Sequence, residues 1–199
     1  MELLLSICLG IALSAACGFR VFVPLLALSI ASLSGHLQLA DSFAWMATWP
    51  ALVLLAVATA LEIAAFYIPV VDNLLDTIAV PAAAVAGIAA TAACVTEVSP
   101  LLQWSLAAIV GGGVATGTQL ATTKLRLAST ATTAGLANPL VATAETAGAA
   151  SLSLLGLVFP ALAALGALAL LAALTWLGVR VVKKAAALAA RVTGDRKTA

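Results

Sequence analysis

The chain has 199 residues, of which 64% are hydrophobic and only 9% are charged, and its mean hydropathy is +1.19. A soluble domain carries roughly 25% charged residues, so this composition excludes a chain surrounded by water and makes lipid its main solvent. The net charge of +1, without basic patches interleaved with aromatic residues, excludes a nucleic-acid-binding protein. We expect a single transmembrane domain over residues 1–192, followed by a polar tail over residues 193–199.

Long apolar segments predict an all-α, polytopic membrane helix bundle. A crossing needs about 20 mostly apolar residues, and lipid tolerates only structures that satisfy their own backbone hydrogen bonds. The segments expected to cross cover residues 3–16, 43–67, 74–95, 101–123, 140–159 and 161–182. A signal peptide is not expected at the start, because Glu2 replaces a positive residue and another apolar stretch follows Cys17. The sequence therefore predicts about six transmembrane helices.

Two segments between these helices are too short or too polar for an ordinary crossing. Residues 19–35 are interrupted by Pro24, and residues 124–138 are rich in Thr, Ser and Ala. Interrupted backbone at membrane depth occurs where protein or a water-filled cavity covers it, which predicts two re-entrant segments that line one cavity. Their similar places favour an inverted repeat, with halves at about 1–97 and 98–182. Two unrelated halves of an ordinary bundle are the alternative.

Lysine and arginine predict the orientation. Basic residues cluster after the last predicted helix: Arg180, Lys183, Lys184, Arg191, Arg196 and Lys197. The positive-inside rule places this end in the cytoplasm, together with the N-terminus if six helices cross. If residues 21–34 also cross, seven helices place the N-terminus outside. The amphipathic basic segment 180–192 is typical of a helix on an anionic leaflet, or of a flank that ends the last crossing.

Ionisable side chains inside apolar segments are candidates for function, because a charge in lipid is unfavourable. The candidates for a substrate or ion pathway are Arg20, Glu62, Asp72, Asp76, Lys124, Arg126 and Glu145. Asp72 and Asp76 are spaced i, i+4 at a predicted helix start, where the helix dipole favours carboxylates. The set is consistent with a salt-bridge network that holds the bundle together, with a proton or cation relay, or with an anion site.

Arg20 and Arg126 each begin one of the short segments. Arginine binds phosphate or carboxylate through two parallel hydrogen bonds, so the pair predicts an anion site, with lipid-contacting arginines that extend to the headgroups as the alternative. A glycine-rich stretch contains Gly111, Gly112, Gly113 and Gly117. Its small-xxx-small spacing favours close helix packing, and the absence of a preceding strand argues against a nucleotide loop.

The sequence has no pattern typical of an enzyme, a metal site or a disulfide framework. His36 is the single histidine, and Cys8, Cys17 and Cys94 lie in apolar stretches without CxxC spacing. We therefore expect no catalytic residue, no cofactor and no bound metal.

Three stretches resemble the signature motifs of a bacterial family of small integral membrane proteins of unknown function. They are GFRVFVPLL at residues 18–26, the pattern LExxxxxIPxxDxxxD at residues 61–76, and TKLRLAST followed by GLANP between residues 123 and 139. Such families often carry Asp-Lys before the Ile-Pro pair, whereas this chain has Phe66-Tyr67. The resemblance implies a bacterial inner-membrane location and supplies no activity.

The expected function is a small transporter or channel for a small ion, an anion or an anionic lipid, because broken helices and intramembrane charges accompany transport. The alternative is a non-transporting scaffold or partner protein whose buried charges are structural. Membrane lipid is the expected partner. A homodimer would enlarge the small cavity that six short helices enclose.

Overall fold

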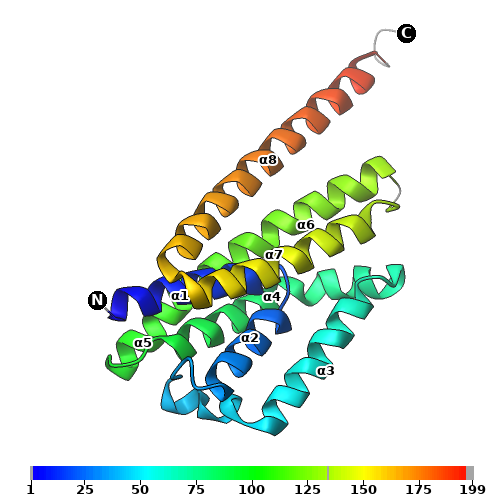
Figure 1. Ribbon diagram of the computed structural model, residues 1–199. Helices are drawn as coiled ribbons and strands as arrows, with labels where there is room; N and C mark the ends of the chain where they lie inside the picture. The colour runs from blue at the N-terminus through cyan, green and yellow to red at the C-terminus, as the bar shows by residue number, and fades with distance from the viewer. Residues whose placement is uncertain (1, 134, 196–199) are drawn as a thin grey trace.

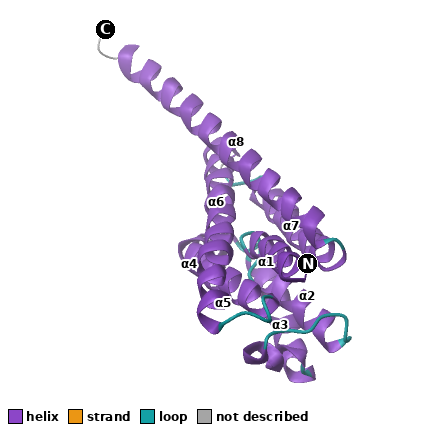
Figure 2. Cartoon of the chain, turned by 90° about the vertical axis from the view of Figure 1, so that its left-hand side faces the viewer, coloured by secondary structure: helices purple, strands orange, loops and turns teal. Residues whose placement is uncertain are grey.

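The computed structural model describes residues 2–133 and 135–195, with side chains at all of these except residues 69, 70, 72–74, 76, 178 and 181–195. Every regular element in the described part is a helix (Figures 1 and 2), which confirms the all-α prediction. In chain order these are α1 (Glu2–Cys17), α2 (Phe22–Leu33), the 3-10 helix η1 (Asp41–Ala47), α3 (Trp49–Ala65), α4 (Pro69–Cys94), α5 (Pro100–Leu106), the π-helix η2 (Ala107–Gly112), α6 (Gly113–Thr133), α7 (Asn138–Val158) and α8 (Pro160–Asp195).

Helix starts follow local sequence signals. The side chains of Thr48 and Ser99 accept hydrogen bonds from the first turns of α3 and α5. A proline occupies the first or second position of α3, α4, α5 and α7, where its missing N–H leaves no hydrogen bond unmade. Gly135, with a φ of 86°, makes the turn between α6 and α7. These local signals define where α3, α4, α5 and α7 begin.

α1 is the central helix of the bundle. It packs against α4, α7 and α8, and Figure 1 shows it running through the middle of the molecule. Its second half is buried, including Leu13, Ala16 and Cys17. Much of the remaining core is alanine, whose small side chain lets helix axes approach closely.

α4 and the π-helical turn η2 approach each other very closely. A Cβ atom added at Gly87 would lie 2.5 Å from the Cβ of Ala115 and 2.6 Å from the carbonyl oxygen of Gly111. A Cβ atom added at Gly111 would lie 2.5 Å from the Oγ1 of Thr91. Only glycine fits at both positions. We call this region the glycine contact.

Fewer helices meet the requirements for a crossing than the sequence predicted. Three described segments are long and apolar enough, Thr77–Cys94, Asn138–Val158 and Pro160–Leu177, and the bent pair η1 and α3 makes a fourth if counted as one span. The expectation of about six single-helix crossings is therefore not met. α1 has only 16 residues, and the segment expected over residues 101–123 is divided among α5, η2 and α6.

The two segments that were predicted to be re-entrant, residues 19–35 and 124–138, differ in the structure. Residues 19–35 do contain a separate short helix, α2, but residues 124–138 do not form a second one, because α6 continues without interruption to Thr133. Threonine hydroxyls there bond to their own helix, as Thr133 does to the carbonyl oxygen of Ser129, so the polar composition requires no break. That prediction was wrong, and the inverted repeat that depended on it is not confirmed.

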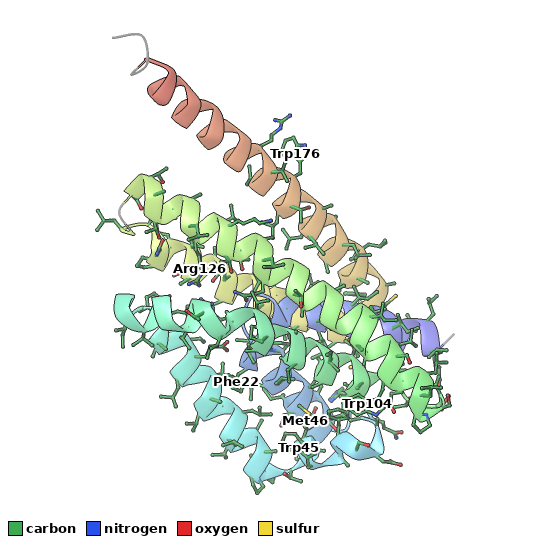
Figure 3. The ribbon with its side chains drawn as sticks, turned by 180° about the vertical axis from the view of Figure 1, so that it is seen from behind. Phe22, Trp45, Met46, Trp104, Arg126 and Trp176 are labelled. Carbon is green, nitrogen blue, oxygen red and sulfur yellow. The ribbon has the colours of Figure 1, made fainter. Side chains whose placement is uncertain are left out.

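α8 begins against the bundle and then leaves it (Figure 1). Ala163, Ala164 and Ala167 are buried near its start, whereas Trp176 is exposed and Arg180 stacks on its ring with 3.8 Å between the guanidinium carbon and the ring centroid. Figure 3 shows Trp45 and Trp104 toward the opposite end of the molecule. The helix continues through residues 180–192, but the side chains of the predicted amphipathic anchor beyond Arg180 lie outside the described residues.

Candidate functional site

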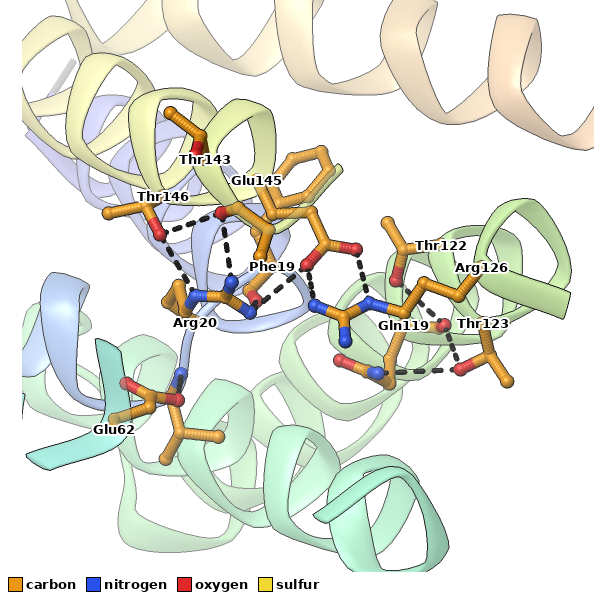
Figure 4. Close-up of polar contacts among 12 residues, drawn as sticks. Phe19, Arg20, Glu62, Gln119, Thr122, Thr123, Arg126, Thr143, Glu145 and Thr146 are labelled. Atoms are coloured by element: carbon orange, nitrogen blue, oxygen red, sulfur yellow. Dashed lines mark hydrogen bonds and ion pairs between the residues drawn. The ribbon is translucent and has the colours of Figure 1, made fainter. Parts of the chain in front are cut away.

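Arg20 lies in the four-residue connection between α1 and α2 and is only 1% exposed. Its guanidinium group points toward α7 (Figure 4). Nε donates to the hydroxyl of Thr146 at 3.1 Å, Nη2 donates to the carbonyl oxygen of Ala142 at 2.9 Å, and Nη1 donates to the carbonyl oxygen of Phe19 at 3.1 Å. Because main-chain and hydroxyl acceptors hold three sides of the group, its position is fixed before any charged partner is considered.

Glu145 on α7 joins Arg20 to Arg126 on α6. Its Oε2 accepts from Nη1 of Arg20 at 3.0 Å and also from Nη2 of Arg126, while its Oε1 accepts from Nε of Arg126 at 3.0 Å. All three residues are at most 4% exposed. Parallel hydrogen bonds between a guanidinium and a carboxylate are the strong form of this interaction. One carboxylate therefore holds two arginines from different elements, and we call the three residues the arginine cluster.

Phe66 covers this cluster from the connection between α3 and α4. Its ring centroid lies 3.9 Å from the guanidinium carbon of Arg20 and 4.5 Å from that of Arg126. A cation near an aromatic face is attracted by the electron-rich ring, and the attraction grows where water is absent. The next residue, Tyr67, shares a 2.8 Å hydrogen bond with Thr143 on α7. The connection is thus fastened to the cluster and to α7.

Glu62 on α3 binds the start of α2. Its two carboxylate oxygens accept from the backbone N–H groups of Val21 at 2.7 Å and Phe22 at 3.0 Å. First-turn N–H groups have no partner within their own helix, and the positive end of the helix dipole favours an anion. A neighbouring helix therefore supplies the cap that the sequence of α2 lacks, directly beside Arg20.

The structure brings together some of the predicted site residues and not others. Arg20, Arg126 and Glu145 are in contact, and Glu62 lies beside them. Lys124 is exposed on α6. Asp72 and Asp76 are on α4, with side chains that lie outside the described residues.

The predicted packing glycines also differ among themselves. Gly111 and Gly112 are buried against α4, and Gly117 faces Leu171 of α8 at 3.4 Å from a Cβ placed on it. Gly113 has open space at that position. Two of these glycines belong to the surface that contacts α4, and a third belongs to the surface that contacts α8.

Sequence reading missed Phe66 and Thr146. Phe66 stood out only because it replaces a charged residue of the resembled family, and no local pattern shows that an aromatic ring will lie over two distant arginines. Thr146 adjoins Glu145, so a carboxylate followed by a hydroxyl within an apolar helix was a usable signal for a guanidinium partner.

Two apolar hollows flank the cluster. The larger, of about 510 Å³, lies among α2, α3, α4 and α6 and is bordered by Glu62, Phe66 and Gln119. The smaller, of about 280 Å³, lies among α6, α7 and α8 and is bordered by Glu145 and Thr122. Phe19 borders both. Glu62 borders one hollow and Glu145 borders the other, and both hollows otherwise have almost entirely hydrocarbon walls.

The arginine cluster is suited to binding charged groups through ion pairs and hydrogen bonds. No group of three or more His, Cys, Asp or Glu side chains is placed to hold a metal among the described residues. Two guanidinium groups directed at one point can bind a planar or tetrahedral oxyanion, and Glu145 occupies that point.

Comparisons with known proteins give a family and no activity. No curated protein and no solved structure matches the chain. One family model, described as a domain of unknown function, matches residues 7–180, a range that contains Arg20, Glu62, Phe66, Arg126 and Glu145. The chain therefore belongs to the family of the domain of unknown function DUF4126.

Proposed function

We propose that the chain is an integral membrane protein that carries an anion, with Arg20 and Arg126 as its binding site. The observation that supports this most directly is the convergence of two buried guanidinium groups on the single carboxylate of Glu145. A carboxylate held in this way marks a place where another oxyanion of similar shape fits. Glu145 then acts as an internal substitute that the transported anion displaces.

The surroundings of the cluster support movement through it. Arg20 lies where α1 ends and α2 begins, and interrupted helices in membrane transporters present such ends to their substrates. The hollow toward α8 is bordered by Glu145, and the hollow toward α3 and α4 is bordered by Phe66, whose ring lies over both guanidinium groups. In the described arrangement the arginines are closed off by Glu145 and Phe66. Transport requires these two side chains to move.

The proposal includes a membrane setting. The bundle lies in a bacterial inner membrane, with α2 as a re-entrant helix and the basic C-terminal segment in the cytoplasm, and two copies associate. The apolar spans and the basic residues that follow them support this orientation. Labelling of single cysteines added at each end tests it. Labelling of the N-terminus from outside the cell, with the C-terminal segment labelled only from inside, would mean that the number of crossings is odd.

The transport test uses purified protein in vesicles, with anion flux and lipid translocation as readouts. Arg126→Ala and Arg126→Lys should both reduce transport, because lysine retains the charge but lacks the planar pair of donors that a bidentate contact needs. Lys124→Ala, at an exposed position two residues away, is the matched control and should transport normally. Full activity of Arg126→Lys would show that a positive charge is sufficient at this position and that transport needs no bidentate contact.

A different outcome would assign the function to the acids. If the vesicles pass protons or metal cations and not anions, and Glu62→Gln abolishes that flux, the carboxylates form the pathway and the arginines are their counter-charges.

A second candidate function is that of a non-transporting scaffold. It is favoured because the hydrogen-bonding groups of Glu145 and Arg20 already have partners. Both oxygens of Glu145 are used, each guanidinium nitrogen of Arg20 donates to an acceptor, and two arginines stand beside two carboxylates in the described part. Such a network holds α6, α7 and the connection between α1 and α2 together. It predicts that wild-type vesicles move neither ions nor lipids while Glu145→Gln destabilises the protein.

A further inference from the structure

The geometry points to a lipid as the transported anion, and we propose that the hollow among α2, α3 and α4 binds its hydrocarbon chain while a phosphate headgroup engages Arg20 and Arg126. This inference rests on the proposed function and narrows it. It assigns a chain-binding role to residues outside the arginine cluster.

The hollow has the size and lining of a chain site. Its volume of about 510 Å³ falls within the range of about 300–1,000 Å³ typical of small-molecule sites. Alanines on both walls, Ala58 on α3 and Ala79 and Ala82 on α4, leave the space that larger side chains would fill. Bare inorganic anions would lose hydration there without a polar partner, whereas a hydrocarbon chain fits the apolar wall.

The hollow continues as a groove. A second space of about 520 Å³ runs between α2 and α4 and shares Val21, Phe22, Ile78 and Ala82 with the first. Its further lining, Leu25, Pro81 and Val85 among others, is apolar as well. An elongated apolar path suits a chain better than a compact ligand.

Phe66 connects this path to the positive charges. Its ring borders the hollow and also lies over both guanidinium groups. A small rotation of that ring would join an apolar space to an oxyanion site, which is the arrangement of a lipid with its chain and headgroup. A phosphate has more acceptor oxygens than the Glu145 carboxylate and so suits two guanidinium groups that approach from different parts of the bundle, the connection between α1 and α2 and helix α6.

The experiment uses the full chain in vesicles with phosphatidic acid that carries a photoreactive group in its acyl chain, and maps the labelled residues. We expect labelling on α3 and α4 around the hollow. Ala58→Trp, which fills the hollow, should reduce labelling about tenfold or more. Ala60→Trp, exposed on the same helix, is the matched control and should label as the wild type does.

Headgroup recognition is tested with a photoreactive diacylglycerol, which has the same chains and no phosphate. Labelling of the hollow by this neutral probe at the level of phosphatidic acid would overturn the inference, since it would show ordinary lipid contact. Arg126→Lys should lower labelling by phosphatidic acid while leaving the weaker labelling by diacylglycerol unchanged. If Ala58→Trp fails to fold, as judged by gel filtration, Ala82→Phe fills the same hollow from α4.

Failure of this inference differs from failure of the proposed function. Flux of water-soluble phosphate that Ala58→Trp leaves unchanged would overturn the lipid assignment and keep the anion carrier. Phosphate-dependent labelling of the hollow, without movement of any anion or lipid, would support the chain site and overturn transport.

Discussion

The arginine cluster and the glycine contact are both buried in the same bundle, yet they hold helices together by opposite means. In the glycine contact, the absence of side chains lets α4 and η2 approach until backbone atoms meet. In the arginine cluster, long charged side chains join α6, α7 and the connection between α1 and α2, and the Arg20 to Glu145 contact spans 125 residues of sequence. The glycine contact is stable only if no side chain fills it, and the arginine cluster is stable only if its charges are balanced. Substitutions in the two regions should therefore destabilise the protein for different reasons.

The largest effect is expected at Glu145. Glu145→Gln keeps the shape but leaves two buried arginines without their shared counter-charge, which should lower the free energy of unfolding by about 3–5 kcal/mol. Thermal and denaturant unfolding in detergent measures this. Glu97→Gln, at an exposed carboxylate, is the control and should change stability little.

The double variant Arg20→Gln with Glu145→Gln shows whether charge balance is the cause. It should be more stable than the sum of the two single losses implies, by about 0.5–3 kcal/mol, because each residue is a partner of the other. If the losses of unfolding free energy in the two single variants simply add in the double variant, the stability of the cluster comes from the fit of its side chains and not from the pairing of their charges.

Gly111, in the glycine contact, and Gly113, two residues later and facing open space, are a matched pair of positions for the same substitution. Gly111→Ala places a methyl group against Thr91 and the α4 backbone and should lower the unfolding free energy by about 1–3 kcal/mol. Gly113→Ala meets open space and should raise it by about 0.4–1 kcal/mol, because alanine restricts the unfolded chain. The same unfolding assay compares them. Equal tolerance of both changes would show that the helices do not approach so closely.

A smaller loss is expected at the cap that Glu62 provides for α2. Glu62→Gln retains one acceptor oxygen but removes the charge that the helix start favours, which should lower the unfolding free energy by about 0.5–2 kcal/mol. Asp41→Asn, at an exposed carboxylate, is the control. A loss as large as that of Glu145→Gln would make Glu62 a full member of the arginine cluster.

The smallest effect is expected at Ser14, beside the glycine contact. Its hydroxyl bonds to the carbonyl oxygen of Gly87 at 3.0 Å and to Thr91 at 2.8 Å. Hydrogen bonds between membrane helices contribute about 0.6 kcal/mol on average, so Ser14→Ala should lower the unfolding free energy by about that amount. Ser151→Ala, exposed on α7, is the control and should be neutral. A loss of several kcal/mol would show that polar contacts, and not close packing, hold this region.

Sequence reading found the helical class and the family, because apolar length and short motifs are local features of the chain. It failed for residues 124–138, where hydroxyl-rich composition suggested a break. The threonines there bond to carbonyl groups one turn earlier, and α6 continues. Composition alone cannot distinguish a polar helix from an interrupted one, because both are rich in the same residues.

The sequence by itself determined which residues carry charge in apolar segments, and these included Arg20, Arg126 and Glu145. Only the tertiary structure decided that these three meet, that Glu62 caps α2 and that Phe66 covers both guanidinium groups. Helix propensity and capping depend on neighbours within a few residues, whereas the partner of a buried charge depends on how distant helices pack. That packing is set in part by glycines such as Gly111, whose spacing is visible in the sequence although the helix it contacts is not.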